Sequence, residues 1–91
     1  QMNGGSKFTV SLGIMPDYGF NGTGVRADAI IPGRLTEKIG LQAGDVLLQL
    51  GEYTFADVYK YTEVLSKFKK GDATQLRINR GKEEKIYAIV F

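Results

Sequence analysis

The chain has 91 residues, a net charge of +2, and neither cysteine nor histidine. Its length fits one small domain, and an apolar fraction of 43% argues against a disordered chain. Without cysteine there is no disulfide or thiolate chemistry, and without histidine the most common general base and metal ligand are missing. We therefore expect a domain that is not an enzyme by itself and that holds no cofactor.

The basic residues are scattered along the chain, which does not favour a nucleic-acid surface. Their densest group is Lys67, Lys69 and Lys70, which we interpret as the solvated last turn of a helix. No apolar run approaches the roughly 20 residues that span a bilayer, so neither nucleic acid nor a membrane is an expected partner. Because the chain begins at Gln1, we expect it to be a segment of a longer protein.

Residues 1–6 are polar and contain glycine, so we expect a lead segment that is disordered or added by cloning. One domain is expected to follow over residues 7–91. Alternation of apolar and polar residues predicts five strands in this domain. The strands are predicted over residues 8–12, 25–31, 46–50, 74–80 and 85–91.

Apolar residues change their period to three and four over residues 57–69, which predicts a long helix. Asp57 is its expected N-cap, the lysines fill its last turn, and Gly71 follows its end. A short helix is predicted over residues 34–39, with Gly40 as a left-handed C-terminal cap. Five strands with two helices predict the α+β class, as a small sandwich or a partly open barrel.

In two of the predicted strands, alternating apolar residues indicate which side chains share one face of the sheet. They are Val46, Leu48 and Leu50 in one strand, and Ile86, Ala88 and Val90 in the last strand. Leu47 adds an apolar residue on the second face of the first of these strands. We therefore expect that strand to be buried on both sides.

Residues 11–14 (SLGI) are similar to the carboxylate-binding loop of the PDZ domains that are attached to bacterial proteases. Pro32-Gly33 and residues 37–47 resemble the segment in which a short helix runs into the pattern A-G-L-x-x-G-D-x-I. Gly71-Asp72 and the hairpin at residues 80–82 fall at the expected distances. The resemblance covers nearly the whole chain and implies a PDZ-like, five-stranded fold.

A finer resemblance concerns residues 12–18 and 58–68, which are similar to the PDZ-type domain of secreted bacterial zinc aminopeptidases of the di-zinc exopeptidase class. This resemblance implies a secreted, periplasmic or cell-envelope protein with a separate catalytic domain as a partner. The zinc ligands would lie in that other domain, so none is carried onto this chain.

The resemblance also implies how the domain works. A polypeptide C-terminus or extended segment would bind as an added strand between the strand that begins at Ile14 and the helix over 57–69. The amides of residues 12–14 would form a nest for the terminal carboxylate, because glycine at Gly13 lets the backbone curl. The expected peptide-binding residues are Ser11, Leu12, Gly13, Ile14, Val58, Tyr61, Thr62 and Leu65.

One departure from the family pattern is Pro16, on the strand that would pair with the peptide. Proline has no N–H to donate, so the groove is expected to be short, or closed by residues 17–24. In the second case Tyr18 and Phe20 would fold over the groove, although they can equally anchor their own loop. Two alternatives stay open. The chain is a docking domain with a vestigial groove, or the regulatory PDZ domain of a serine protease of the high-temperature-requirement type.

Overall fold

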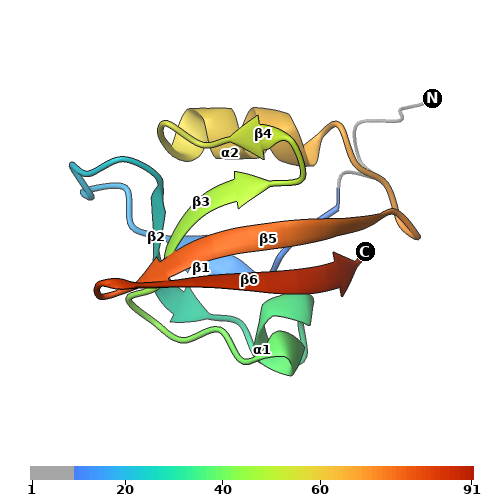
Figure 1. Cartoon of the computed structure of the whole chain (residues 1–91), viewed down its shortest axis with the longest axis horizontal. Helices are drawn as coiled ribbons and strands as arrows, with labels where there is room; N and C mark the ends of the chain where they lie inside the picture. The colour runs from blue at the N-terminus through green and yellow to red at the C-terminus, as the bar shows by residue number, and fades with distance from the viewer. Residues whose placement is uncertain (1–9) are drawn as a thin grey trace.

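An antiparallel sheet with two helices forms the part of the chain that the computed structural model describes, residues 10–91. The strands are β1 (Ile14–Pro16), β2 (Val25–Ile30), β3 (Val46–Leu50), β4 (Tyr53–Thr54), β5 (Ala73–Arg80) and β6 (Glu83–Val90). The helices are α1 (Leu35–Ile39) and α2 (Val58–Leu65). Figure 1 shows α2 beside β4 on one side of the sheet and α1 beside β6 on the other. The predicted α+β class is confirmed.

The sheet runs in the order β1–β2–β3–β5–β6, and the short β4 pairs with β3. β2 is shared between two neighbours, because Val25 and Arg26 pair with β3 whereas Ala27 to Ile30 pair with β1. β1 and β6 are therefore the two outer strands of the described sheet. β4, which the sequence did not indicate, adds a sixth strand where the turn at Gly51 folds Tyr53 back onto Leu50.

The first strand differs most from the prediction. Residues 8 and 9 of the strand expected over 8–12 lie outside the described residues, as does the expected lead over 1–6, and residues 10–12 are not in a strand. The strand that the resemblance implied from Ile14 onward is present, and it begins directly after Gly13, whose φ of 85° turns the chain. Only glycine adopts such a backbone conformation at little cost.

Local capping signals were predicted correctly. α1 ends at Gly40, which has a φ of 93° and donates its backbone N–H to Glu37 and Thr36. α2 begins after Asp57, whose side chain accepts a hydrogen bond from the Lys60 N–H at 2.9 Å. Both caps depend on residues close in sequence, so the sequence alone was enough to predict them.

The C-terminal end of α2 was predicted wrongly. The helix ends at Leu65. The backbone N–H groups of the next three residues donate to the carbonyl three positions earlier rather than four, as in the 2.9 Å hydrogen bond from Lys67 N–H to the Val64 carbonyl. This tighter turning brings Phe68 against Phe91 and Tyr53, with ring centroids 5.5 and 6.0 Å away. The lysines after residue 66 therefore lie beyond the helix, outside its last turn.

A bulge explains why β3 buries a different set of side chains from the alternating one. Its pairing with β5 shifts between Leu47 and Gln49. Such an extra residue shifts the alternation of side chains by one position. Leu47 and Leu50 are therefore both fully buried although they are three residues apart, whereas Val46 and Leu48 are only half-buried.

β6 presents its apolar series Ile86, Ala88 and Val90 to the outside. The register pairs Leu76 with Tyr87 and Ile78 with Lys85, and directly opposed residues share one face of the sheet. Because Leu76 and Ile78 are buried, the core side of β6 carries Lys85, Tyr87 and Ile89.

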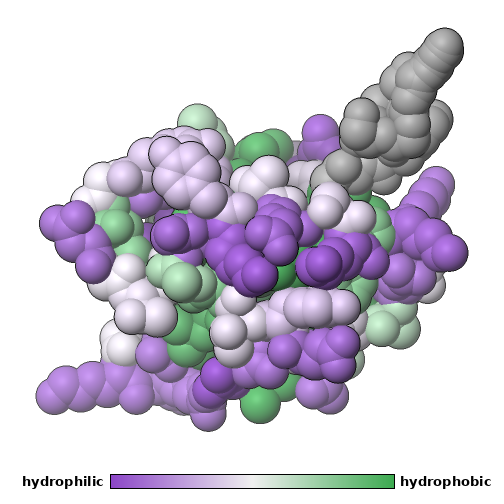
Figure 2. All heavy atoms as spheres, turned by 90° about the horizontal axis from the view of Figure 1, so that it is seen from above, coloured by the Kyte–Doolittle hydropathy of each residue, from purple (hydrophilic) through white to green (hydrophobic). Residues whose placement is uncertain are grey.

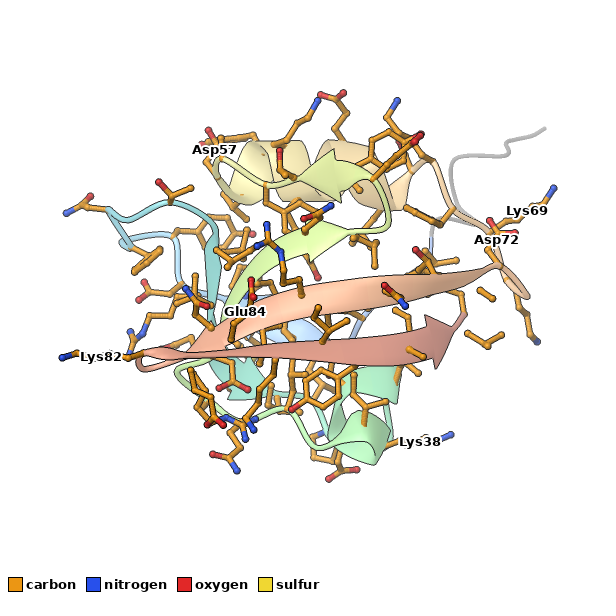
Figure 3. The ribbon with its side chains drawn as sticks, in the orientation of Figure 1. Lys38, Asp57, Lys69, Asp72, Lys82 and Glu84 are labelled. Carbon is orange, nitrogen blue, oxygen red and sulfur yellow. The ribbon has the colours of Figure 1, made fainter. Side chains whose placement is uncertain are left out.

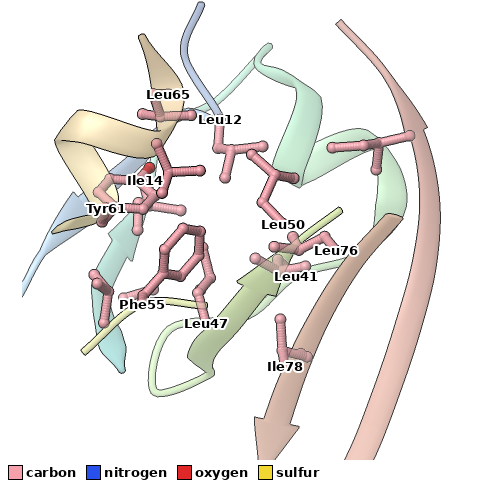
Figure 4. Close-up of a cluster of buried hydrophobic side chains, with 14 residues drawn as sticks. Leu12, Ile14, Leu41, Leu47, Leu50, Phe55, Tyr61, Leu65, Leu76 and Ile78 are labelled. Atoms are coloured by element: carbon pink, nitrogen blue, oxygen red, sulfur yellow. The ribbon is translucent and has the colours of Figure 1, made fainter. Parts of the chain in front are cut away.

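The core lies between the sheet and α2, as Figure 4 shows. Phe55 and Tyr61 meet edge to face at a centroid distance of 5.2 Å, next to Leu47 and Leu50. Edge-to-face contact is the favoured geometry for aromatic pairs. The face seen from above, over α2, is mostly hydrophilic or intermediate in hydropathy, with smaller apolar areas between the polar side chains and at the edges (Figure 2).

Two isoleucines on β6 provide a matched test of this strand's orientation. Ile89 is 3% exposed and Ile86 is 58% exposed. We expect Ile89→Ala to lower the free energy of unfolding by about 2–4 kcal/mol, because it leaves a cavity in the core. Ile86→Ala should change the free energy by less than about 0.5 kcal/mol. Urea denaturation of both variants measures this difference, and equal losses would contradict the register.

Candidate functional site

The chain turns sharply at Leu12 and Gly13 before it enters β1, and we name this feature the Leu12–Gly13 corner. The backbone N–H of Thr36 donates to the Leu12 carbonyl at 3.1 Å, and its hydroxyl donates to the Gly13 carbonyl at 3.1 Å. The N–H of Ile31 reaches the same Gly13 carbonyl at 2.8 Å. Thr36 is fully buried, so these bonds are shielded from water and fix the corner against α1.

Gly13 is needed at this corner for two reasons. Its φ of 85° is strained for any residue with a side chain. A Cβ atom at this position would also lie only 2.1 Å from the Cβ of Arg34 and 3.4 Å from the hydroxyl of Thr36. The corner therefore depends on a close approach between two backbone segments that no larger residue permits.

β1 presents hydrogen-bonding groups at the free edge of the sheet. The Gly13 carbonyl accepts from Ile31 N–H, and the Asp17 N–H donates to the Arg26 carbonyl at 2.9 Å, so both residues face β2. Backbone groups alternate in direction along a strand, so Ile14 and Pro16 face away from β2. The N–H of Ile14 is thus available to a new strand, whereas Pro16 has none to offer.

One of the three amides predicted to hold a carboxylate is already occupied. The Gly13 N–H donates to the hydroxyl of Ser11 at 3.1 Å. The N–H of Leu12 has no acceptor among the described residues, and the N–H of Ile14 faces the open edge. A carboxylate at this loop would therefore replace the Ser11 hydroxyl or use the other two amides.

The side chains predicted to line the groove come together, but most of them are buried. Leu12 and Ile14 meet Tyr61 and Leu65 of α2 within one cluster (Figure 4). All four have little exposed surface and pack as part of the core. Burial also raises the pKa of the Tyr61 phenol well above its ordinary value, and the nearby Tyr18 adds a smaller effect. Tyr61 is therefore neutral at ordinary pH.

The remaining predicted residues stay accessible. Ser11 and Thr62 are exposed, and Val58 is half-buried on the same side of α2 as Thr62. The Thr62 hydroxyl donates to the Val58 carbonyl at 3.1 Å. The buried side of α2 is centred on Tyr61, Val64 and Leu65, so Val58 and Thr62 lie on its flank.

The two loop aromatics differ in their placement. Tyr18 is 76% exposed, so it does not close the edge of β1. Phe20 covers Gly22 in its own loop, where a Cβ on Gly22 would lie 2.5 Å from the end of the Phe20 ring. Phe20 therefore anchors the loop, which was one of the two roles considered from the sequence.

Arg34 is a candidate site residue that sequence reasoning missed. The first carbons of its side chain lie against Gly13, although 21 positions separate the two residues (34 − 13). Arg34 is exposed and forms no ion pair within residues 10–91. No local pattern links the two residues, because their contact depends on how α1 packs against the corner.

Asp45 and Arg80 form a nearly buried ion pair that the sequence did not indicate. The guanidinium of Arg80 donates two hydrogen bonds to the Asp45 carboxylate, at 2.9 and 2.8 Å, and a third to the Gly40 carbonyl at 3.1 Å. The carboxylate also accepts the Gln42 N–H at 2.9 Å. Asp45 is 1% exposed, so this pair ties the connection between α1 and β3 to the end of β5.

The pKa of Asp45 follows from these contacts. Burial by itself raises the pKa, but the hydrogen bonds from Arg80 and Gln42 and the charge of Arg80 outweigh burial. The net pKa is lower than the ordinary value of a carboxyl group. Both carboxylate oxygens of Asp45 accept hydrogen bonds. A buried charge is tolerated when it is paired and hydrogen-bonded in this way, so we interpret the pair as a structural link.

Residues 10–91 contain neither a cluster of side chains that could hold a metal ion nor a helix that could span a membrane. No group of three or more acidic side chains there is arranged to hold a metal ion. None of the described helices has the length and apolar character needed to cross a membrane.

Comparison with protein families finds no family model that matches the chain, and comparison with curated proteins finds no match. The fold and the site together define a small α+β domain with an accessible sheet edge at β1.

Removal of the Asp45 charge should destabilise the domain and change its acid sensitivity. We expect Asp45→Asn to lower the free energy of unfolding by about 2–4 kcal/mol at pH 7, because Arg80 loses its buried partner. A lowered carboxyl pKa stabilises the fold above the unfolded value of about 3.9, and this stability is lost as pH falls through the folded pKa.

Denaturation from pH 7 to pH 2 measures both effects. The original chain should lose stability below about pH 4, and the variant should lose less over the same interval. Identical pH profiles for the two proteins would show that Asp45 is not responsible for the acid sensitivity.

Proposed function

We propose that this chain is a PDZ-type domain that binds a polypeptide C-terminus as an added strand along β1, beside α2. It would serve as a non-catalytic module of a larger bacterial peptidase, most like the domain attached to secreted zinc aminopeptidases. The observation that carries this proposal is the outward-facing N–H of Ile14, on an outer strand that begins at a glycine corner. β-Strand addition at an exposed edge is a common mode of peptide recognition.

The charges and amides of the loop support a carboxylate ligand. Within residues 10–91 the N–H groups of Leu12 and Ile14 have no acceptor, and the Gly13 N–H becomes a third donor if Ser11 turns away. Arg34 adds a positive charge next to this corner. Successive backbone amides with a nearby cation form a typical anion site.

The length of the groove follows from Pro16. A bound strand would form a hydrogen bond with Ile14 and would find no donor at the next outward-facing position. Recognition would therefore concentrate on the last one or two residues of the ligand. Their side chains would contact Val58 and Thr62 on the flank of α2.

A second candidate function is a docking domain with a vestigial groove. The burial of Leu12, Ile14, Tyr61 and Leu65 favours it, because these side chains fill the space between β1 and α2 themselves. In that case the domain would bind no peptide and would instead stabilise the catalytic domain of its parent protein. Deletion of the domain from the parent protein would then lower the thermal stability of the parent.

A peptide titration distinguishes the two functions. The probes are acetylated pentapeptides that end in Val, Leu, Ile or Phe, each with a free carboxylate and each also as the C-terminal amide. We expect the carboxylate form of at least one probe to shift the amide NMR signals of Leu12, Ile14 and Thr62. The matching amide should bind about tenfold more weakly or worse, because it lacks the anion.

Pro16→Ala tests the geometry of the groove. The variant regains one donor, and a hydrogen bond is worth about 0.5–1.5 kcal/mol, so affinity for the best pentapeptide should rise roughly 2- to 10-fold. Affinity for the unacetylated dipeptide with the same C-terminus should stay unchanged, because the residue opposite Pro16 is the third from the C-terminus, which the dipeptide lacks. The absence of any shift at a peptide concentration of about 5 mM would contradict the peptide-binding function and favour the docking domain.

A further inference from the structure

A concave surface lies where β6 ends, and we name it the lysine pocket. It is a hollow of about 630 Å³ with an apolar floor formed by Val10, Leu35, Val90 and Phe91. These four residues come from the segment before β1, from α1, from β6 and from the residue after β6. The volume lies within the range of roughly 300–1,000 Å³ that is typical of ligand sites.

Three lysines surround this floor. Lys38 comes from α1, and Lys69 and Lys70 come from the turn before β5. None of the three forms an ion pair within residues 10–91. Residues 1–9 contain no Asp or Glu, so that segment has no side chain that could neutralise them. The described lining residues carry positive charge and no carboxylate side chain.

The turn that carries two of the lysines is held in place. The N–H of Lys69 donates to the Asp72 carboxylate at 3.0 Å, and the Asp72 N–H donates back to the Lys69 carbonyl at 3.0 Å. Gly71 N–H and the Asp72 carbonyl bond to the backbone of Phe91, at 2.6 and 2.9 Å. The lysines thus project from a backbone that is fixed beside β6. Because α2 ends at Leu65, they lie outside its last turn, where the helix dipole would have favoured them.

β6 extends the apolar surface away from the pocket. Its outward-facing residues Ile86, Ala88 and Val90 form a row that leads along the strand to the pocket. β6 is also the last strand of the described sheet. An extended chain fits such a row, because its side chains repeat at the same spacing as those of the strand. These features favour a polypeptide over a small molecule.

We propose that the lysine pocket binds an acidic polypeptide segment that places one large apolar side chain on the pocket floor. Its carboxylates pair with Lys38, Lys69 and Lys70, and its extended part follows β6. This proposal does not depend on the function proposed for β1, but the two sites are neighbours, because Ser11 lines the pocket and also accepts the Gly13 N–H.

Two other occupants fit less well. Nucleic acid would need several stacking aromatics, and Phe91 is the single aromatic residue among the described lining residues. A second copy of the chain offers Glu83 and Glu84 on β6, but these residues already pair with Lys85 at 3.6 Å and Arg77 at 2.6 Å.

The test uses the peptide acetyl-EEDLFDEE-amide and the complete chain. Both ends of the peptide are blocked, so it has no terminal carboxylate for the Leu12–Gly13 corner. We expect saturable binding at peptide concentrations below about 1 mM, with amide NMR shifts at Leu35 and Val90 and none at Ile14 or Thr62. Two control peptides replace the acids by Gln and Asn, or replace Leu and Phe by Ser, and both should bind at least about tenfold more weakly.

Charge reversal provides a matched control in the protein. The double variant Lys69→Glu and Lys70→Glu should weaken binding at least about tenfold, because it places like charges against the peptide. Lys82→Glu makes the same kind of change at the far hairpin, at the opposite end of the molecule from Lys38 and Lys69 (Figure 3), and should alter affinity less than about twofold.

Several results would overturn the proposal. They are no binding of the acidic peptide, equal binding of the uncharged peptide, equal losses from the reversals at Lys69/Lys70 and at Lys82, or shifts at Ile14 and Thr62 instead. Binding to phosphatidylserine vesicles without binding to the peptide would assign the lysines to a membrane surface. Concentration-dependent dimerisation measured by analytical ultracentrifugation, if lost with Val90→Ser, would assign the pocket to a second copy of the chain.

Discussion

The hydrogen bonds between Thr36 and the Leu12–Gly13 corner are the interaction on which the rest of the site depends. Two donors of one buried residue hold both carbonyls of the corner, so the chain can leave the corner in one direction only. This direction makes β1 an outer strand and turns the Ile14 N–H away from β2. The same packing of α1 brings Arg34 against Gly13. Strand edge, free amides and positive charge thus have a common structural cause.

A second link holds α1 from its other end. The connection that follows the helix is joined to β5 through Asp45 and Arg80, and Arg80 also binds the last carbonyl of the cap at Gly40. α1 has only five residues, which is too short to be stable by itself in water. Its position is therefore set by tertiary contacts at both ends, and it carries residues of both proposed sites.

The two outer strands of the sheet offer different chemistry. At β1 the free groups are backbone amides with one arginine, which suit a terminal carboxylate and little more because of Pro16. At the end of β6 the free groups are three lysine side chains around an apolar floor, which suit several carboxylates on one segment. The two surfaces would thus select different parts of a polypeptide, a chain end and an acidic stretch.

The sequence predicted correctly those features that are determined by residues close together in the chain. The α+β class, the extent of α1 and β3, the cap at Gly40 and the N-cap at Asp57 all follow from residues within a few positions. Features set by distant contacts were not predicted. The burial of Leu47 depends on a bulge against β5, and the orientation of β6 depends on its register with Leu76 and Ile78.

In the candidate site, too, local features were predicted from the sequence and features set by distant contacts were not. The sequence indicated Gly13 and Pro16 correctly as the residues that shape the β1 edge, because their backbone preferences are intrinsic. It did not indicate that Ser11 occupies the Gly13 N–H, or that Arg34 lies beside the corner. The end of α2 was misplaced because Phe68 packs against Tyr53 and Phe91, which are distant in sequence.

The most direct test of this account compares Gly13→Ala with Gly33→Ala by chemical denaturation. Both glycines have a positive φ, 85° and 80°, but a Cβ on Gly33 would meet nothing within 4 Å. Both variants carry the backbone strain of about 1–2 kcal/mol, and only Gly13→Ala must also separate α1 from the corner. We expect Gly13→Ala to lower the free energy of unfolding by at least about 2 kcal/mol more than Gly33→Ala. Equal losses in the two variants would contradict the central role of the Leu12–Gly13 corner.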